Sequence, residues 1–438
     1  MRDTIRQKIA DSLASPVPSF TRRDVRLPAV GGKAVAVIGM RRAGKTTFLW
    51  QIISDRLARG ADRAGLLYFS FEDERLAGMT AADLSMLVRE YYSLQPERRD
   101  RRKTVFLLDE IQNVPGWEVF VRRLLDTERI EIFLSGSSAK LLSREVATSM
   151  RGRGMEALVH PFSFREYLRH VGREPGVAPE RLPKTARSVL DRDLGAYLTA
   201  GGFPETVGTS PRDRFDLLRG LVDTALFRDV VERHGVSHPV ALRYLVRQLL
   251  GNASGLFSVN KFYNDLKSQG IPVAKDTLHA YLSHLEDSFL IRSVSIASNS
   301  ERRRMVNPRK VYPVDPGLIP VFDREGRSDR GSSLETCVLL ELVRRGAEVA
   351  YVRTPGGFEV DFLARYPDGK EELIQACADL DDPATREREV RAILDAKAGH
   401  PKASLHLVTL HPEGSRGLPR NIAIHGPAWF LGPHPGPD

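Results

Sequence analysis

The sequence predicts an α/β fold whose first large domain is a parallel sheet with helices on both faces. Three observations predict it. An apolar run, Val35–Ile38, leads into a glycine-containing loop, and an apolar helical pattern follows from Phe48. A second run, Val105–Leu108, is wholly apolar, as in a strand that is buried on both faces. Strand patterns then alternate with helical patterns up to residue 138, which is typical of parallel α/β sheets.

The loop after the first strand reads G-x-x-x-x-G-K-T from Gly39 to Thr46, the pattern of a phosphate-binding loop (P-loop). Glycines let the backbone curl so that its N–H groups point at phosphate oxygens, and the following helix adds its positive amino end. Lys45 can reach the β- and γ-phosphates, where it also serves catalysis. Nucleotide binding is therefore predicted for Gly39, Arg42, Ala43, Gly44, Lys45, Thr46 and Thr47.

The acidic pair after the second apolar run completes this site. Asp109 stands at the carboxyl end of its strand, the edge at which open parallel sheets bind ligands. Its carboxylate and the Thr46 hydroxyl are predicted to hold Mg²⁺, and Glu110 is predicted to polarise the attacking water. ATP and Mg²⁺ are the expected ligands. The alternative is that the two acids only begin a loop. A P-loop in the same chain makes this alternative less favoured.

Composition excludes several classes of protein. The chain has 438 residues, too many for one core, so about three domains are expected. It contains no apolar run long enough to span a bilayer, and its amino end lacks the apolar core of a signal peptide. The two cysteines, Cys337 and Cys377, suit a reducing compartment and exclude a disulfide framework. A cytoplasmic protein is expected.

Two further groups are candidates for the same reaction. Ser137 and Ser138 follow the strand pattern that starts at Ile130; sensing of the γ-phosphate is favoured for Ser137, whereas Ser138 can equally cap the next helix. Arg151 and Arg153 flank a glycine, and an arginine near the γ-phosphate of a neighbouring subunit would stabilise transition-state charge. Arg153 is the first choice, with solvated arginines as the alternative. A homo-oligomer is therefore expected.

The segment 212–310 is basic, with 16 Lys and Arg against 10 Asp and Glu in a chain of net charge +9. Helical patterns cover Ser258–Gln269 and Lys275–Asp287, and strand patterns follow from Phe289, which is the order of a winged helix. In that mode DNA would be contacted by Lys275, Thr277, His279, Arg302, Arg303 and Arg304, the last three in a basic hairpin. The alternative is a lid or an oligomer contact.

From residue 310 the pattern changes to a helix opening at Gly331, strands near Glu348, Glu359 and Glu372, a helix from Thr385 and a further strand. This is a small α/β domain. We expect a lead-in over 1–33, the P-loop domain over 34–208, a helical and winged-helix domain over 209–309, the small domain over 310–431, and a loose tail over 432–438.

Taken together, the motifs resemble, nearly end to end, those of prokaryotic AAA+-like P-loop ATPases that carry a C-terminal domain of unknown function related to restriction-endonuclease-like nucleases. The resemblance implies an ATPase core, a winged-helix segment and a nuclease-like domain. Besides the P-loop it rests on Phe71–Leu76, Leu108–Gln112, Ser135–Ser138, Pro161–Glu166, Gly201–Glu205 and Glu359–Phe362.

Active members of that nuclease fold hold Mg²⁺ with a helix glutamate, an aspartate and a following Glu-x-Lys. Here Glu335 or Glu341 matches the helix acid and Asp361 the aspartate, but the next strand offers Gln375 and Cys377. A neutral amide binds a hard cation less well than a carboxylate, so we expect no nuclease activity and a docking role for DNA or a partner. Lys370, Glu371 and Glu372 are the alternative groups that could substitute.

The sequence thus predicts a Mg²⁺-dependent, ATP-hydrolysing AAA+-like ATPase that acts on or with DNA. The alternative is a nucleotide-dependent switch or scaffold that binds protein partners and uses hydrolysis only to reset. The basic segment 212–310 favours the first.

Overall fold

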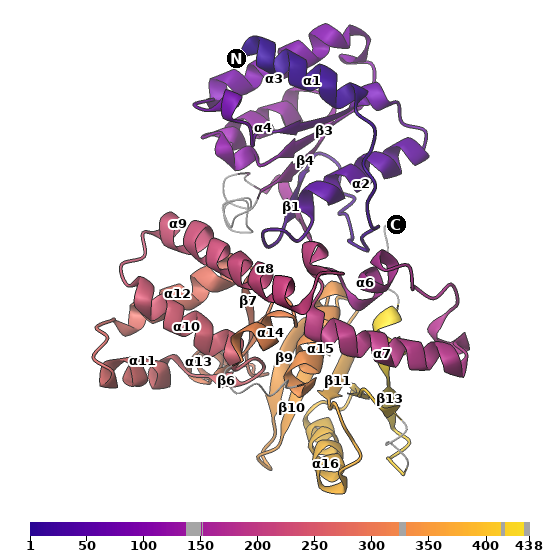
Figure 1. The fold of residues 1–438 in the computed structure, drawn as a ribbon, viewed down its shortest axis with the longest axis vertical. Coiled ribbons are helices and arrows are strands. Elements are labelled where there is room, and N and C mark those ends of the chain that lie inside the picture. The colour runs from indigo at the N-terminus through magenta and orange to yellow at the C-terminus, as the bar shows by residue number, and fades with distance from the viewer. Residues whose placement is uncertain (137–149, 151, 324–329, 413–416, 433–438) are drawn as a thin grey trace. The chain divides into compact units, whose positions relative to one another are not determined.

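The structure is a computed structural model that describes residues 1–136, 150, 152–323, 330–412 and 417–432 (Figure 1). The chain forms two compact units, which divide between His160 and Pro161. The first unit holds a parallel sheet with helices and the second holds a separate mixed sheet, so the α/β prediction is confirmed.

Five parallel strands form the sheet of the first unit, in the order β2-β3-β4-β1-β5. The strand that leads into the P-loop is therefore not next to the Asp109 strand, because β4 lies between them. Carboxyl ends of parallel strands share one edge, so the P-loop and Asp109 meet at that edge. The strands are β1 Ala34–Ile38, β2 Leu66–Ser70, β3 Thr104–Asp109, β4 Ile130–Ser135 and β5 Gly154–Leu158.

Helices cover both faces of this sheet because its strands are apolar on both faces. Val105 and Leu107 of β3 belong to the core cluster that includes Phe48 of α2. Phe106, which points to the opposite face, packs its ring against Tyr91 of α3 at a centroid distance of 5.0 Å. The helices are α1 Arg2–Ala14, α2 Lys45–Ala58, α3 Ala81–Leu94 and α4 Trp117–Thr127.

The predicted lead-in over 1–33 contains a helix of the first unit. Ile5 and Ile9 of α1 are fully buried. Arg2 and Arg6 each donate a hydrogen bond to the carboxylate of Glu90 on α3, at 2.6 and 3.1 Å. Apolar burial and these ion pairs therefore join α1 to the unit.

The predicted boundary at residue 208 also differs from the structure, which divides the chain after residue 160. The segment behind the division holds α6 Phe164–His170 and α7 Lys184–Ala200. Tyr197 of α7 shares one core cluster with Leu334 and Phe362 of the C-terminal part. Apolar contacts with distant residues thus assign 161–208 to the second unit.

The middle of the second unit is helical and carries a small antiparallel sheet of order β6-β8-β7. Because β8 runs from Arg309 to Pro313, the predicted boundary at 309 cuts through a strand of this sheet. The elements are α8 Pro211–Thr224, a π-helical segment Ala225–Val231, α9 Glu232–His234, α10 Pro239–Gly251, β6 Leu256–Phe257, α11 Val259–Ser268, α12 Lys275–Asp287, β7 Ile291–Val294, α13 Glu301–Val306 and β8.

The C-terminal part holds a five-stranded mixed sheet of order β13-β12-β11-β10-β9. Strands β9, β10 and β11 pair antiparallel, and β11, β12 and β13 pair parallel. The elements are α14 Leu318–Phe322, α15 Arg330–Arg344, β9 Glu348–Arg353, β10 Glu359–Arg365, β11 Glu371–Ala376, α16 Pro383–Gly399, β12 Ser404–Val408 and β13 Ile422–His425. Within the described ranges, every helix is too short or too polar to cross a bilayer.

Candidate nucleotide-binding site

The loop between β1 and α2 requires glycine at two positions. Gly39 has φ of 145° and Gly44, the N-cap of α2, has φ of 97°, both in the region that other residues avoid. A Cβ at Gly39 would lie 2.1 Å from the carbonyl oxygen of Val159. The backbone therefore curls in the way that a phosphate-binding loop needs, and the segment after β5 packs directly against it.

Lys45 is the first residue of α2 and its side chain lies inside this loop. It is 6% exposed, and its Nζ donates hydrogen bonds to the carbonyl oxygens of Gly39 and Met40, each at 3.0 Å. The ammonium is thus held inside the loop, next to the amino end of α2. Positive charge and backbone donors at one point form an anion site.

Three hydroxyl groups from three elements surround the carboxylate of Asp109, which is buried at the end of β3. Thr46 Oγ1 of α2 lies 2.9 Å from its Oδ2, and the Tyr68 hydroxyl of β2 donates to the same oxygen at 2.7 Å. Ser135 of β4 donates to Oδ1. Thr46 and Asp109, the two predicted Mg²⁺ ligands, are therefore in direct contact.

Tyr68 and Ser135 were not predicted as site residues. They come from neighbouring strands, and no spacing in the sequence links them to Asp109. Burial first, and then the charge of Asp109, raises the pKa of the Tyr68 phenol, which therefore remains a hydrogen-bond donor. The available signal was the position of Ser135 at the carboxyl end of its strand; Tyr68 lies in the middle of β2 and had no such signal.

Glu110 follows Asp109 in a left-handed backbone conformation, with φ of 54° and ψ of 40°. This conformation is unfavourable for a residue with a Cβ, and it turns the chain out of the strand direction at once. The Gln112 amide donates a hydrogen bond to Glu110 Oε2. The carboxylate thus stands at the same sheet edge as Asp109, with its own supporting partner.

Arg23 is a third residue of the site that was not predicted from the sequence. It is 5% exposed; one guanidinium nitrogen donates to the carbonyl of Ala43 in the P-loop at 2.8 Å, and the other donates to the carbonyl of His160. Its backbone N–H donates to Gln51 Oε1 of α2 at 2.7 Å. Arg23 therefore fastens the P-loop to the segment after β5. It lies outside every motif, so no local pattern indicated it.

Of the other candidates, Arg153 lies at the opposite edge of the sheet. Its carbonyl accepts the N–H of Ala34, the first residue of β1, whereas Gly39 follows the last residue. Its guanidinium forms an ion pair with Asp126 of α4. A role of Arg153 in a neighbouring subunit stays a prediction. Ser137, Ser138 and Arg151 lie outside the described residues.

The donor set fits a nucleotide with Mg²⁺. Carboxylate and hydroxyl oxygens are the ligands that this hard cation prefers, and Asp109 and Thr46 supply one of each. Gly39 has no room for a Cβ because the Val159 backbone lies against it, and its positive φ lets the loop take the curled form of a phosphate-binding loop.

Comparisons with known proteins agree with this geometry. A family model described as an AAA domain matches residues 31–168, and a second, described as a domain of unknown function, matches residues 191–327. The uncharacterized protein MJ1544 of Methanocaldococcus jannaschii is 32% identical over 401 residues, which cover 90% of this chain and 85% of the relative. The chain belongs to the family of MJ1544. Residues 31–168 form its AAA-type P-loop ATPase domain.

Two further similarities extend over most of the chain. An uncharacterized protein of Haemophilus influenzae is 30% identical over 333 residues, 76% of this chain and 79% of that protein. The Walker-type ATPase of Pyrococcus abyssi has 17% sequence identity and a TM-score of 0.43, and the match covers 74% of this chain and 95% of the other.

The predicted DNA contacts of this MJ1544 relative lie on two helices of the second unit. Lys275, Thr277 and His279 are on α12, where the Lys275 ammonium lies 5.8 Å from the centroid of the Tyr263 ring. The three arginines lie in the connection between β7 and β8, which pair antiparallel as the predicted hairpin requires. The short helix α13 inside this connection was not predicted; Ser300 caps it by accepting a hydrogen bond from the N–H of Arg303. Arg302 and Arg303 remain exposed.

In the C-terminal part, the structure brings Glu335 of α15 and Asp361 of β10 to one point. Lys310 of β8 lies between them and donates to each at 2.8 Å. The other candidate acid, Glu341, pairs instead with Arg345 at 2.9 Å. The position at which the resemblance expects a lysine is Cys377, directly after β11; the lysine that lies here comes from β8, which no motif indicated.

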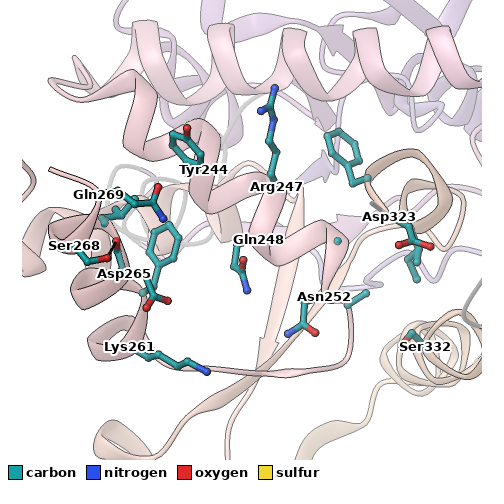
Figure 2. Close-up of a pocket in the computed structure, with 16 residues that line it drawn as sticks. Tyr244, Arg247, Gln248, Asn252, Lys261, Asp265, Ser268, Gln269, Asp323 and Ser332 are labelled. Atoms are coloured by element: carbon teal, nitrogen blue, oxygen red, sulfur yellow. Dashed lines mark hydrogen bonds between the residues drawn. The ribbon is translucent and has the colours of Figure 1, made fainter. Parts of the chain in front are cut away.

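The second unit also contains a cavity of about 1030 Å³ whose lining comes mainly from α10, α11, α14 and the start of α15 (Figure 2). Arg247 and Lys261 line it together with Asp265 and Asp323. Since its lining carries both signs of charge, the cavity selects neither anions nor cations by charge alone.

Proposed function

We propose that this chain binds ATP with Mg²⁺ at the P-loop and hydrolyses it. The observation that carries the proposal is the 2.9 Å contact between Thr46 and Asp109, next to a Lys45 that is buried in the loop. These groups come from separate stretches of sequence, and each has the chemistry that phosphoryl transfer requires at that place.

The roles follow from the positions of the groups. Lys45 and the loop N–H groups bind the phosphate charge. Thr46 and Asp109 would hold Mg²⁺, whose charge would offset that of the phosphates. Tyr68 and Ser135 orient the Asp109 carboxylate. Glu110, at the same edge, orients the water and accepts its proton.

Two substitutions test this assignment. Lys45→Ala removes the phosphate counter-charge and should lower turnover at least about 100-fold. Glu110→Gln keeps the shape but removes the base, so ATP should still bind while turnover falls. Lys33→Ala is the control, since Lys33 is a half-buried lysine of the same unit whose Nζ donates to the Gly152 carbonyl at 2.7 Å. If Lys45→Ala hydrolyses ATP as fast as the wild type does, the assignment of the nucleotide-binding site is wrong.

We further propose that the ATPase acts on or with DNA, through a winged-helix segment of the second unit. The order α10, β6, α11, α12, β7, β8 and the sheet order β6-β8-β7 support a winged helix. Exposed basic residues on α12 and α13 support phosphate contacts. DNA-stimulated ATP turnover is expected; turnover that DNA leaves unchanged favours a nucleotide-dependent switch with protein partners.

The DNA proposal has a test in salt dependence. Replacing Arg302, Arg303 and Arg304 by Ala should weaken binding and flatten the fall of affinity with salt, because fewer counterions are released. Arg212, Arg214 and Arg219 on α8 give a control triple with the same change of net charge. If both triples bind DNA equally well, the contact surface is not on α13.

For the C-terminal part we propose a nuclease-like fold without nuclease activity. The order α15, β9, β10, β11, α16, β12 supports a fold of that type. Gln375 faces Asp361 across β10 and β11 in place of a carboxylate, and its amide oxygen accepts the Asp361 N–H at 3.3 Å. Labelled linear and branched DNA should stay intact with Mg²⁺ or Mn²⁺; cleavage that Asp361→Ala abolishes refutes the proposal.

A further inference from the structure

Lys310 is surrounded by three carboxylates that lie far apart in the sequence. Its Nζ is 2.8 Å from Glu335 Oε1, 2.9 Å from Glu359 Oε1 and 2.8 Å from Asp361 Oδ1. The lysine side chain is only 5% exposed. Its three oxygen partners belong to α15 and β10, whereas Lys310 belongs to the three-stranded sheet.

Two of these carboxylates have additional partners that fix them in place. The Tyr312 hydroxyl donates to Glu335 Oε1 at 2.7 Å. The backbone N–H of Ala376 donates to Asp361 Oδ2 at 3.0 Å. Neither contact involves Lys310. The acids are therefore positioned by the folded scaffold around a common point, and that point is where the ammonium lies.

Charge accounts for the need for a cation at this point. Desolvated carboxylates are costly unless they are paired, and three acids here share one buried lysine. Burial, followed by the charge of Asp361, raises the pKa of Glu335. Burial lowers the pKa of Lys310, but the charges of Asp361, Glu335 and Glu359 outweigh it and the net shift is upward. The lysine is therefore held as a cation.

We propose that Lys310 is a built-in counter-ion: its ammonium takes the place of a divalent cation among Glu335, Glu359 and Asp361, and it thereby ties β8 to the C-terminal sheet without any metal. As the chain stands, no group of three or more His, Cys, Asp or Glu side chains among the described residues is arranged to hold a metal ion. The inference does not depend on ATP hydrolysis or on DNA binding.

The distances predict which cation can replace the ammonium. The Nζ–oxygen distances are 2.8 to 2.9 Å. Ca²⁺ binds oxygen at about 2.3–2.6 Å and tolerates irregular geometry, whereas Mg²⁺ requires about 2.0–2.1 Å. The carboxylates must move less to bind Ca²⁺. A variant without the ammonium should therefore prefer Ca²⁺ over Mg²⁺.

The test is Lys310→Ala in the full, nucleotide-free chain. It should lower the melting midpoint, and Ca²⁺ should restore part of the loss while calorimetry detects about one Ca²⁺ ion that the wild type does not bind. Adding Asp361→Asn to this variant should abolish the Ca²⁺ response. Any cation bound at Thr46 and Asp109 is common to all variants and cancels in the comparison.

Lys397→Ala is the matched control. The Lys397 Nζ donates to the carbonyls of Pro401 and Ala403 at 2.8 and 2.6 Å, so its loss leaves neutral partners and should give no Ca²⁺ response. If Lys310→Ala does not fold alone, refolding from urea with and without Ca²⁺ gives the readout, and equal yields contradict the proposal. Lys310→Met, which keeps the apolar stem, should give the same Ca²⁺ response. A folded Lys310→Ala without any response, or a wild type that binds Ca²⁺ equally, overturns it.

Discussion

At the residue scale, the Asp109 carboxylate depends on the hydroxyl of Tyr68, a residue that lies outside every motif. Tyr68→Phe keeps the ring and removes the 2.7 Å hydrogen bond to Oδ2. A hydrogen bond to a charged group contributes about 1.5 kcal/mol or more, so turnover should fall roughly tenfold as the carboxylate loses its orientation. Steady-state ATP hydrolysis measures this effect.

Tyr91→Phe is the control for this prediction. Tyr91 is a buried tyrosine of the same unit, and its hydroxyl donates to the backbone carbonyl of Ala64 at 2.8 Å, on an element other than the P-loop. Its loss should affect stability but not turnover. Equal turnover of the two variants contradicts an orienting role for Tyr68.

Arg23 provides a second prediction at this scale. Arg23→Ala removes both hydrogen bonds that fasten the P-loop backbone to the segment after β5. The loop should then lose preorganisation, and ATP should bind about tenfold more weakly in a fluorescent-nucleotide titration. The neighbouring Arg22, half-exposed and paired with Asp55 at 2.7 Å, makes Arg22→Ala the control, because exposed ion pairs contribute little. Equal affinities of Arg23→Ala and Arg22→Ala for ATP would contradict a role of Arg23 in holding the P-loop.

The sequence could predict the central residues of this site but not the residues that hold them in position. Gly39, Lys45 and Asp109 were predictable because the strand, loop and helix that position them are consecutive or end in a recognisable acid. Arg23, Tyr68 and Ser135 reach the site through strand order and chain crossing, which leave no mark in local spacing. Ordinary residue types at unremarkable positions acquire a role only through tertiary contact.

At the element scale, the helix α6 begins with a capping box whose two members are buried. Ser163 Oγ accepts from the N–H of Glu166 at 3.1 Å, and Glu166 Oε2 accepts from the N–H of Ser163 at 2.9 Å. Ser163→Ala should cost about 1–2 kcal/mol and lower the melting midpoint. Ser210→Ala, at the exposed cap of α8, should cost less. A larger fall of the melting midpoint in Ser210→Ala than in Ser163→Ala would contradict the expectation that the buried cap contributes more to stability.

Elements with a clear apolar pattern were predictable from the sequence, whereas elements without such a pattern were not. The predicted helix Lys275–Asp287 matches α12 in both bounds. By contrast, β5 starts with a glycine, contains Glu156 and lies at the sheet edge, so it pairs through its backbone rather than through an apolar pattern. The short helix α13 was not predicted within the basic hairpin, because its run of arginines has no apolar pattern; the cap at Ser300 supports its helical turn.

At the scale of the whole molecule, stability should depend on pH through His406 and His425. His406 Nδ1 and His425 Nε2 are 2.9 Å apart, with Glu372 and Arg345 among the charged groups that influence them. Burial, followed by the charge of His406, lowers the pKa of His425 from 6.5 to about 4. Between these values the unfolded chain binds more protons, so stability should fall as the pH drops from 6.5 towards 4, by at most about 3 kcal/mol.

Calorimetric melting midpoints between pH 7 and 5 measure this dependence. His425→Gln should flatten it, since the amide does not titrate in this range. His279→Gln, at an exposed position of α12, should leave it unchanged. A slope that survives in His425→Gln assigns the pH dependence to other groups.

The position of Arg153 makes a prediction about assembly. It lies at the amino edge of the sheet, and the P-loop of the same unit lies at the carboxyl edge, so Arg153 can act on a γ-phosphate only in another subunit. Arg153→Ala should then lower turnover by about 10³-fold while ATP still binds, because transition-state charge loses its partner. Arg129→Ala is the control, since this exposed arginine precedes β4 at the same edge and bonds the Asp100 carbonyl at 3.2 Å.

Mixing Arg153→Ala with Lys45→Ala subunits should restore part of the activity, since one partner supplies an intact P-loop and the other an intact arginine. An active ATPase that stays monomeric at all concentrations, or a mixture without recovery, contradicts assembly with the nucleotide between subunits.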